Sequence, residues 1–147
     1  MKVNFTNGCA RKIKVVAKED IKMKDFEMMY RMPGEDLKMM EGVNKKNTYE
    51  CISGKIQDCM DACRHGELDM YVDDAGLMKE LEPNILIKRS RTNNITDRDT
   101  LLVGPVVFTS TDHGGNTISL TPKAKEIIAN MKPARLGFWQ IYIIEAY

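Results

Sequence analysis

The chain has no long apolar run and no marked excess of charge of either sign. No stretch approaches the roughly 20 apolar residues that cross a bilayer, and residues 1–8 lack the apolar core of a signal peptide. Lysine and arginine number 22 against 21 aspartates and glutamates, a net charge of +1 that predicts no general attraction to nucleic acid or anionic lipid. We therefore expect a cytoplasmic protein without a membrane partner.

Histidines and catalytic motifs are also scarce. The two histidines, His65 and His113, limit schemes of acid–base catalysis. The sequence contains no Walker loop, dinucleotide fingerprint, nucleophile elbow or paired-cysteine motif. An enzyme is therefore the less favoured class, and we predict no catalytic residue and no cofactor.

The cysteines are few, and their spacing does not favour a metal site. Thiolates and an imidazole are ligands that zinc prefers, and the set that offers them is Cys51, Cys59, Cys63 and His65. However, Cys59 and Cys63 fall on an apolar stripe, where thiols behave as small hydrophobic groups. We expect reduced thiols and no bound metal, because cytoplasmic proteins rarely hold disulfides.

The most regular part of the chain runs from Leu101 to Ile128. Residues 101–109 and 117–120 have the composition of strands, and residues 112–116 have that of a tight turn, so they predict a hairpin. Thr121 offers a capping hydroxyl, and Pro122 suits the first turn of a helix. We predict a helix over about 121–131.

A second helix is predicted over about 53–65. Ser53 offers a cap, and apolar residues follow at helical spacing: Ile56, Cys59, Met60 and Cys63. Gly66 would end this helix, a strand would cover 68–72, and residues 77–78 would return alongside after a turn at 73–76.

The two ends of the chain complete the predicted fold. Residues 1–48 predict a hairpin followed by a helical segment broken at Pro33-Gly34, with its methionines as core filler, and 49–52 predict a brief strand. Residues 138–144 form a last strand that is apolar on both faces. We therefore predict one α+β domain over 1–147, with a mixed or antiparallel sheet, two main helices and this C-terminal strand.

One local excess of positive charge lies between residues 88 and 98. Arginine matches phosphate through two parallel hydrogen bonds, and asparagine adds neutral donors. The predicted ligand-binding residues of this exposed loop are Lys88, Arg89, Arg91, Asn93, Asn94 and Arg98.

Several short motifs from Ile52 onward, about half of the chain, resemble a known family. They are Ile56-Gln57, Gly66-Glu67-Leu68, Asp74-Ala75-Gly76-Leu77, Leu81-Glu82-Pro83-Asn84, Val103-Gly104-Pro105-Val106 and Ser119-Leu120-Thr121. This part, within 49–147, resembles an uncharacterised family of small α+β proteins from bacteriophages, plasmids and other bacterial mobile elements. The segment Cys63-Arg64-His65 departs from the family pattern, and the first fifty residues have no clear counterpart. The resemblance implies an architecture and a mobile-element origin, and no activity.

The family resemblance and the basic loop between residues 88 and 98 together favour a non-catalytic accessory protein of a phage or mobile element. We expect it to bind a small anionic ligand, such as a nucleotide signal of host defence that it would sequester, and to form a homo-oligomer. One alternative is a protein-binding inhibitor or adaptor that uses the C-terminal strand or the methionine-rich segment. Another is a hydrolase or nucleic-acid enzyme whose site is assembled from distant residues.

Overall fold

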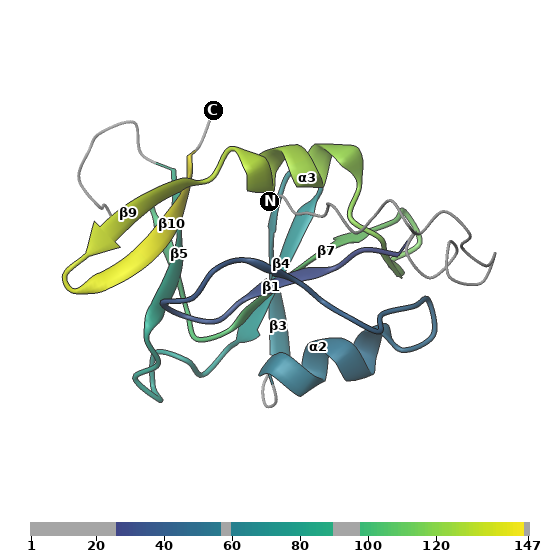
Figure 1. Ribbon diagram of the computed structural model, residues 1–147, viewed down its shortest axis with the longest axis horizontal. Helices are drawn as coiled ribbons and strands as arrows, with labels where there is room; N and C mark the ends of the chain where they lie inside the picture. The colour runs from purple at the N-terminus through teal and green to yellow at the C-terminus, as the bar shows by residue number, and fades with distance from the viewer. Residues whose placement is uncertain (1–25, 57–59, 90–97, 146–147) are drawn as a thin grey trace, which may run out of the picture.

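A computed structural model describes residues 26–56, 60–89 and 98–145 (Figure 1). Of these residues 43% lie in strands and 16% in helices, so the fold is β-rich. The predicted α+β arrangement with two main helices is wrong. Both helices are short, α2 (Thr48–Ile56) and α3 (Pro122–Ala129), and most buried backbone groups are paired by strand ladders instead.

The larger sheet, here sheet A, is antiparallel at every described pairing. Its strands in spatial order are β2 (Lys38–Met39), β1 (Met29–Arg31), β7 (Val106–Thr111), β4 (Leu68–Asp73) and β3 (Met60–His65), and β8 (Thr117–Ile118) pairs with β7.

The smaller sheet, sheet B, carries the C-terminal strand inside it. Its order is β6 (Thr100–Val103), β5 (Pro83–Lys88), β10 (Trp139–Glu145) and β9 (Lys132–Leu136). The predicted last strand is confirmed as β10, which runs parallel to β5 and antiparallel to β9. Both edges of this apolar strand are therefore paired within the sheet.

The helix predicted over 53–65 is wrong in both position and length. The helix α2 begins at Thr48, where the Cys51 N–H bonds the Asn47 carbonyl, and the Ser53 hydroxyl donates to the Glu50 carbonyl instead of capping. The predicted strand at 49–52 is part of this helix. Residues 60–65 form β3, which pairs with β4 through a tight turn where Gly66 has φ of 63°. The cross-strand pairing of this hairpin outweighs the helical spacing of the apolar residues.

The helices predicted before residue 43 are also wrong. The strands β1 and β2 form a hairpin there, with Met29 opposite Met39 and with Gly34 in its turn at φ of 78°. The break predicted at Pro33-Gly34 is therefore the turn of that hairpin. The hairpin predicted within residues 1–17 lies outside the described residues.

The strand predicted over 101–109 is two strands in two sheets. Gly104, at φ of 77°, separates β6 from β7, and its N–H donates to the Glu82 carbonyl. The turn at 112–116 and the helix after it are confirmed: the Thr121 hydroxyl accepts the Ala124 N–H at 3.1 Å, and Pro122 occupies the first turn.

After β4, the turn predicted at 73–76 is confirmed, but residues 77–78 do not form a strand alongside β4. Asp73 accepts the Ala75 N–H, as the turn requires, whereas Leu77 and Met78 are 71% and 87% exposed and pair with no described strand. Gly76 is needed here because a Cβ on it would lie 2.7 Å from a Val103 methyl, not because of a positive φ.

Helices α3 and α2 lie on opposite sides of β1 and β7 of sheet A (Figure 1), and a hydrophobic cluster packs on each side of this sheet. One cluster, with Met70, Phe108 and Ile128, lies between sheet A, sheet B and α3. The other, with Ile52 and Val107, lies under α2, whose isoleucines each contribute about 1.5–3 kcal/mol by burial. The methionine prediction is confirmed for Met28, which is fully buried. No helix in the described residues has the length and apolar character needed to cross a membrane.

Candidate functional site

The predicted basic loop is only partly described, and a carboxylate balances its first cation. Lys88, at the end of β5, lies 3.7 Å from the carboxylate of Asp99, whose side chain is fully buried. The same carboxylate accepts the backbone N–H of Arg89 at 2.8 Å. Lys88 is therefore part of an internal ion pair and not a free cation.

Arg89 and Arg98 are exposed at the two ends of this loop. Arg89 lies close to β3, because its charge adds to the effect of burial in lowering the pKa of His65. Burial raises the pKa of the Cys63 thiol, and Arg89 opposes that shift. The remaining predicted residues, Arg91, Asn93 and Asn94, lie outside the described residues.

The cysteine and histidine set is not brought together as one group. Cys51 packs in the cluster under α2, whereas Cys63 packs in the cluster on the opposite face of sheet A. Cys59 lies outside the described residues. In the part of the chain that the structure covers, no three histidines, cysteines or acidic residues gather as metal ligands would.

A different feature, the edge strand β2, has the geometry of a binding site. Among the described strands β2 lies at the end of sheet A and is paired only with β1. The Met40 N–H donates to the Met28 carbonyl at 2.8 Å, and Met39 lies opposite Met29. Because hydrogen-bonded and non-bonded pairs alternate in an antiparallel ladder, the N–H and C=O of Met39 point away from β1. In the part of the chain that the structure describes, no strand pairs with this outer edge, so it can accept one.

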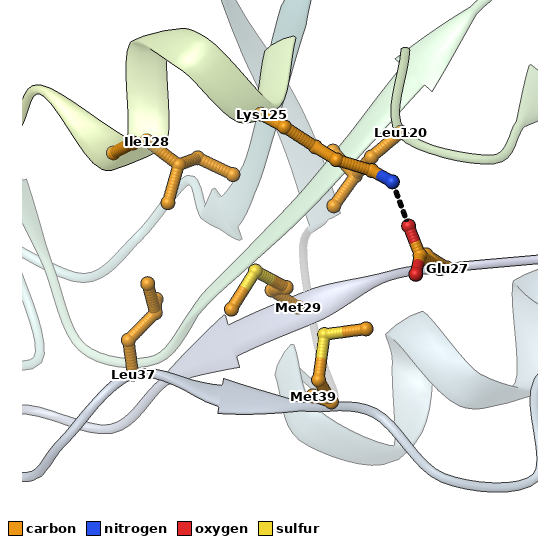
Figure 2. A pocket seen from close by; sticks show the side chains of 8 residues that line it. Glu27, Met29, Leu37, Met39, Leu120, Lys125 and Ile128 are labelled. Atoms are coloured by element: carbon orange, nitrogen blue, oxygen red, sulfur yellow. Dashed lines mark ion pairs between the residues drawn. The ribbon is translucent and has the colours of Figure 1, made fainter. Parts of the chain in front are cut away.

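On one side of β2 lies a cavity of about 320 Å³, which we call the α3-side cavity. Figure 2 shows Met29, Met39 and Leu37 on its sheet side and Ile128 on its helix side. The described residues that line it are Glu27, Met29, Leu37, Met39, Leu120, Lys125, Ile128 and Ala129. Two of these described side chains are charged, Glu27 and Lys125, and they form an ion pair with each other. The cavity is therefore apolar with a neutralised rim.

On the other side of β2 lies a wider hollow of about 800 Å³, the α2-side hollow. Its lining is Tyr30, Leu37, Lys38, Met39, Met40, Glu41, Glu50, Cys51, Gly54 and Lys55. Lys38 pairs with Glu35 at 3.2 Å, and the Lys55 ammonium lies 4.1 Å from the Tyr30 ring centre. Burial, and then the charge of Glu50, raises the pKa of Cys51. This hollow is polar at its rim and shares Leu37 and Met39 with the cavity opposite.

Sequence reasoning missed this edge because it assigned the segment to helices. The available signal was the pair of methionines at 39 and 40, which face opposite sides of a strand. The strand itself is too short to show an alternating pattern.

A known domain family covers the part of the chain that contains β2 and the two spaces beside it. Residues 21–132 match a domain of unknown function, DUF3846. The chain belongs to the DUF3846 family. An uncharacterised family is thus confirmed, and the match begins at residue 21, so residues 21–50 do have a counterpart in it. No curated protein and no solved structure matches the chain.

The DUF3846 region contains all the described residues that line the cavity and the hollow. It ends as β9 begins, so the β9–β10 hairpin lies almost wholly beyond it. At the tip of that hairpin Phe138 is 95% exposed and Trp139 39% exposed. This exposed pair belongs to the part of the chain outside the family match.

Proposed function

We propose that this DUF3846 protein is a non-catalytic binding protein that takes an extended segment of a protein partner as an additional strand beside β2. The observation that carries the proposal is the outward-pointing backbone of Met39, with a cavity on each face of the sheet beside it. Strand addition of this kind takes affinity from main-chain hydrogen bonds and specificity from pockets for alternate side chains.

The lining suits a surface that accommodates several related sequences. Met29, Met39 and Met40 are flexible and polarisable, and methionine is common on binding surfaces that adjust to their partners. Met39 is 43% exposed, so a bound strand would remove apolar surface from water.

The expected affinity is moderate. Each added main-chain hydrogen bond contributes about 0.5–1.5 kcal/mol, and one buried aliphatic side chain about 1.5–3 kcal/mol. These gains are offset by the entropy of ordering an extended peptide, which gives dissociation constants on the order of micromolar.

Panning a displayed library of random linear peptides against the full chain tests the proposal. The variant Met39→Pro removes the outward N–H without removing a hydrogen bond to β1, and proline is tolerated on edge strands. Peptides that bind the unmodified chain and not this variant support the proposal. The absence of any selected peptide, or equal binding to both proteins, overturns it.

The exposed arginines favour a second candidate, an anionic ligand at the loop that Arg89 and Arg98 flank. In this version the protein is a cytoplasmic accessory protein of a phage or mobile element that sequesters a nucleotide signal of host defence. Support comes from Arg89, whose exposed guanidinium is the type of group that binds phosphate through paired hydrogen bonds.

Calorimetric titration with a panel of cyclic and linear nucleotides tests this candidate. Heat that is lost in Arg89→Ala, with the nucleotide recovered unchanged, supports sequestration. A chemically converted nucleotide would indicate an enzyme. If no nucleotide of the panel gives heat, the anionic-ligand candidate is overturned and a protein partner is favoured.

A further inference from the structure

We infer that the partner strand alternates large uncharged apolar residues with basic residues, the apolar ones facing α3 and the basic ones facing α2. This inference rests on the proposed function and names the chemistry of the segment that β2 would accept.

The two faces of sheet A are already defined at β2. Met29 and Met39 line the α3-side cavity, whereas Tyr30, Lys38 and Met40 line the α2-side hollow. A strand that pairs with β2 continues both faces, and its successive side chains point to opposite sides. One residue of the partner therefore enters the α3-side cavity, and the next one enters the α2-side hollow.

The α3-side cavity selects an uncharged side chain. Its walls are aliphatic and thioether groups, and Glu27 and Lys125 at its rim neutralise each other. The backbone N–H of Glu27 donates to the Ser119 hydroxyl at 2.7 Å, which anchors the backbone at this rim. A charged partner residue would lose its hydration here without gaining an opposite charge. Leucine, isoleucine, methionine or phenylalanine fits the chemistry of the walls.

The α2-side hollow selects a basic side chain. Of its two lysines, Lys38 pairs with Glu35, whereas Lys55 lies over the Tyr30 ring and keeps its charge. Among the described residues, the two carboxylates of the lining therefore outnumber the one lysine without a carboxylate partner. Within residues 26–56, 60–89 and 98–145, neither Glu41 nor Glu50 forms an ion pair. Two carboxylates thus face a hollow of about 800 Å³, which is wide enough for lysine or arginine.

Three short synthetic peptides separate the two faces by fluorescence anisotropy with the full chain. One alternates leucine and lysine, a second replaces lysine by glutamate, and a third replaces leucine by serine. We expect the first to bind up to about 5-fold more tightly than the glutamate peptide, since one exposed ion pair contributes up to about 1 kcal/mol. The advantage over the serine peptide should be larger than about 5-fold, since one buried leucine contributes more.

Matched variants assign each preference to its side. Glu41→Lys should weaken binding of the leucine–lysine peptide about 3- to 10-fold, a loss within the range for one charge reversal. The control Glu126→Lys makes the same charge change on α3, outside the described linings of the cavity and the hollow, and should leave binding unchanged. Ala129→Phe, which occupies the α3-side cavity from its exposed rim, should weaken the leucine-containing peptides and not the serine peptide.

The outcomes distinguish the inference from the function on which it rests. If peptides bind in a manner that Met39→Pro abolishes, but without preference for the leucine–lysine pattern, the inference is overturned and strand addition stands. If none of the three peptides binds while the random library yields peptides that Met39→Pro no longer binds, the inference is overturned and strand addition stands. If Met39→Pro has no effect on binding of any peptide, both are overturned.

Discussion

Arg31 and Asn84 exchange three hydrogen bonds across the junction of the two sheets. The guanidinium Nη1 donates to the Asn84 carbonyl at 3.1 Å and to its side-chain oxygen at 2.7 Å, and Asn84 Nδ2 donates back to the Arg31 carbonyl at 2.7 Å. Arg31 also donates to the carbonyls of Glu35 and Gln140, and its guanidinium lies 4.7 Å from the Tyr142 ring centre. A cation that is 1% exposed is thus satisfied by neutral oxygens, although burial lowers its pKa.

Replacing Asn84 should lower the free energy of unfolding more than replacing Arg31. Asn84→Leu leaves a buried cation short of acceptors and should lower the free energy of unfolding by about 3–5 kcal/mol. Arg31→Met removes the charge together with its need for partners and should cost about 2–3 kcal/mol. Urea unfolding measures both, and a larger loss for Arg31→Met would contradict the assignment of Asn84 as the main partner of that charge.

Two glycines should respond in opposite directions to alanine. A Cβ at Gly76 would lie 2.7 Å from the Val103 Cγ2 and 3.1 Å from the Asp73 carbonyl, so Gly76→Ala should destabilise the fold by about 1–3 kcal/mol. Gly54, in α2, has nothing within 4 Å of that position, and Gly54→Ala should stabilise by about 0.5–1 kcal/mol. Thermal unfolding of the two variants checks the contrast, and equal shifts would argue against the packing at Gly76.

The cap of α3 should be sensitive to loss of one hydroxyl. The Thr121 Oγ1 accepts the Ala124 N–H and donates to Glu67 at 2.7 Å, so Thr121→Ala should cost about 0.5–2 kcal/mol. Thr121→Ser keeps the oxygen and should retain most of the stability in urea unfolding. A serine variant as unstable as the alanine variant would show that the methyl group, and not the cap, stabilises this helix.

Asp73 should make the free energy of unfolding depend on pH in the acid range. The hydrogen bond from Lys79, followed by that from the Ala75 N–H, lowers the pKa of Asp73 below its ordinary value of 3.8. Because the pKa of Asp73 is lower in the folded state than in the unfolded state, its ionised form stabilises the fold. This stabilisation is complete at pH above the pKa of the unfolded state and is lost as pH falls through the pKa of the folded state. The difference in unfolding free energy between the unmodified chain and Asp73→Asn should therefore shrink as pH falls from about 5 to about 2. A difference that is constant over this range would contradict the assignment.

Sequence reasoning succeeded where structure depends on neighbours along the chain. The Thr121 cap and the Asp112 turn follow from local chemistry, and both are confirmed. It failed where pairing with another strand, and not the spacing of apolar residues, decides the outcome. Met60 to His65 has helical spacing but becomes β3, because β4 follows Gly66 and pairs with it residue by residue.

The site could not be predicted for a similar reason. The β2 edge is defined by which strands lie beside it, and a strand of two residues carries almost no sequence pattern of its own. The basic loop was visible as a run of charge, but the partner of Lys88 is Asp99, on the far side of the loop. Charge pattern alone did not identify that pairing.

Amide hydrogen exchange of the chain labelled with ¹⁵N-methionine tests strand addition at β2 most directly. Met39 and Met40 are neighbours with opposite roles, since the Met40 N–H is already bonded to Met28 and that of Met39 points outward. Adding the leucine–lysine peptide should slow exchange of the Met39 amide markedly and leave the Met40 amide nearly unchanged. A Met39 amide whose exchange is unaffected by saturating peptide would contradict the proposal.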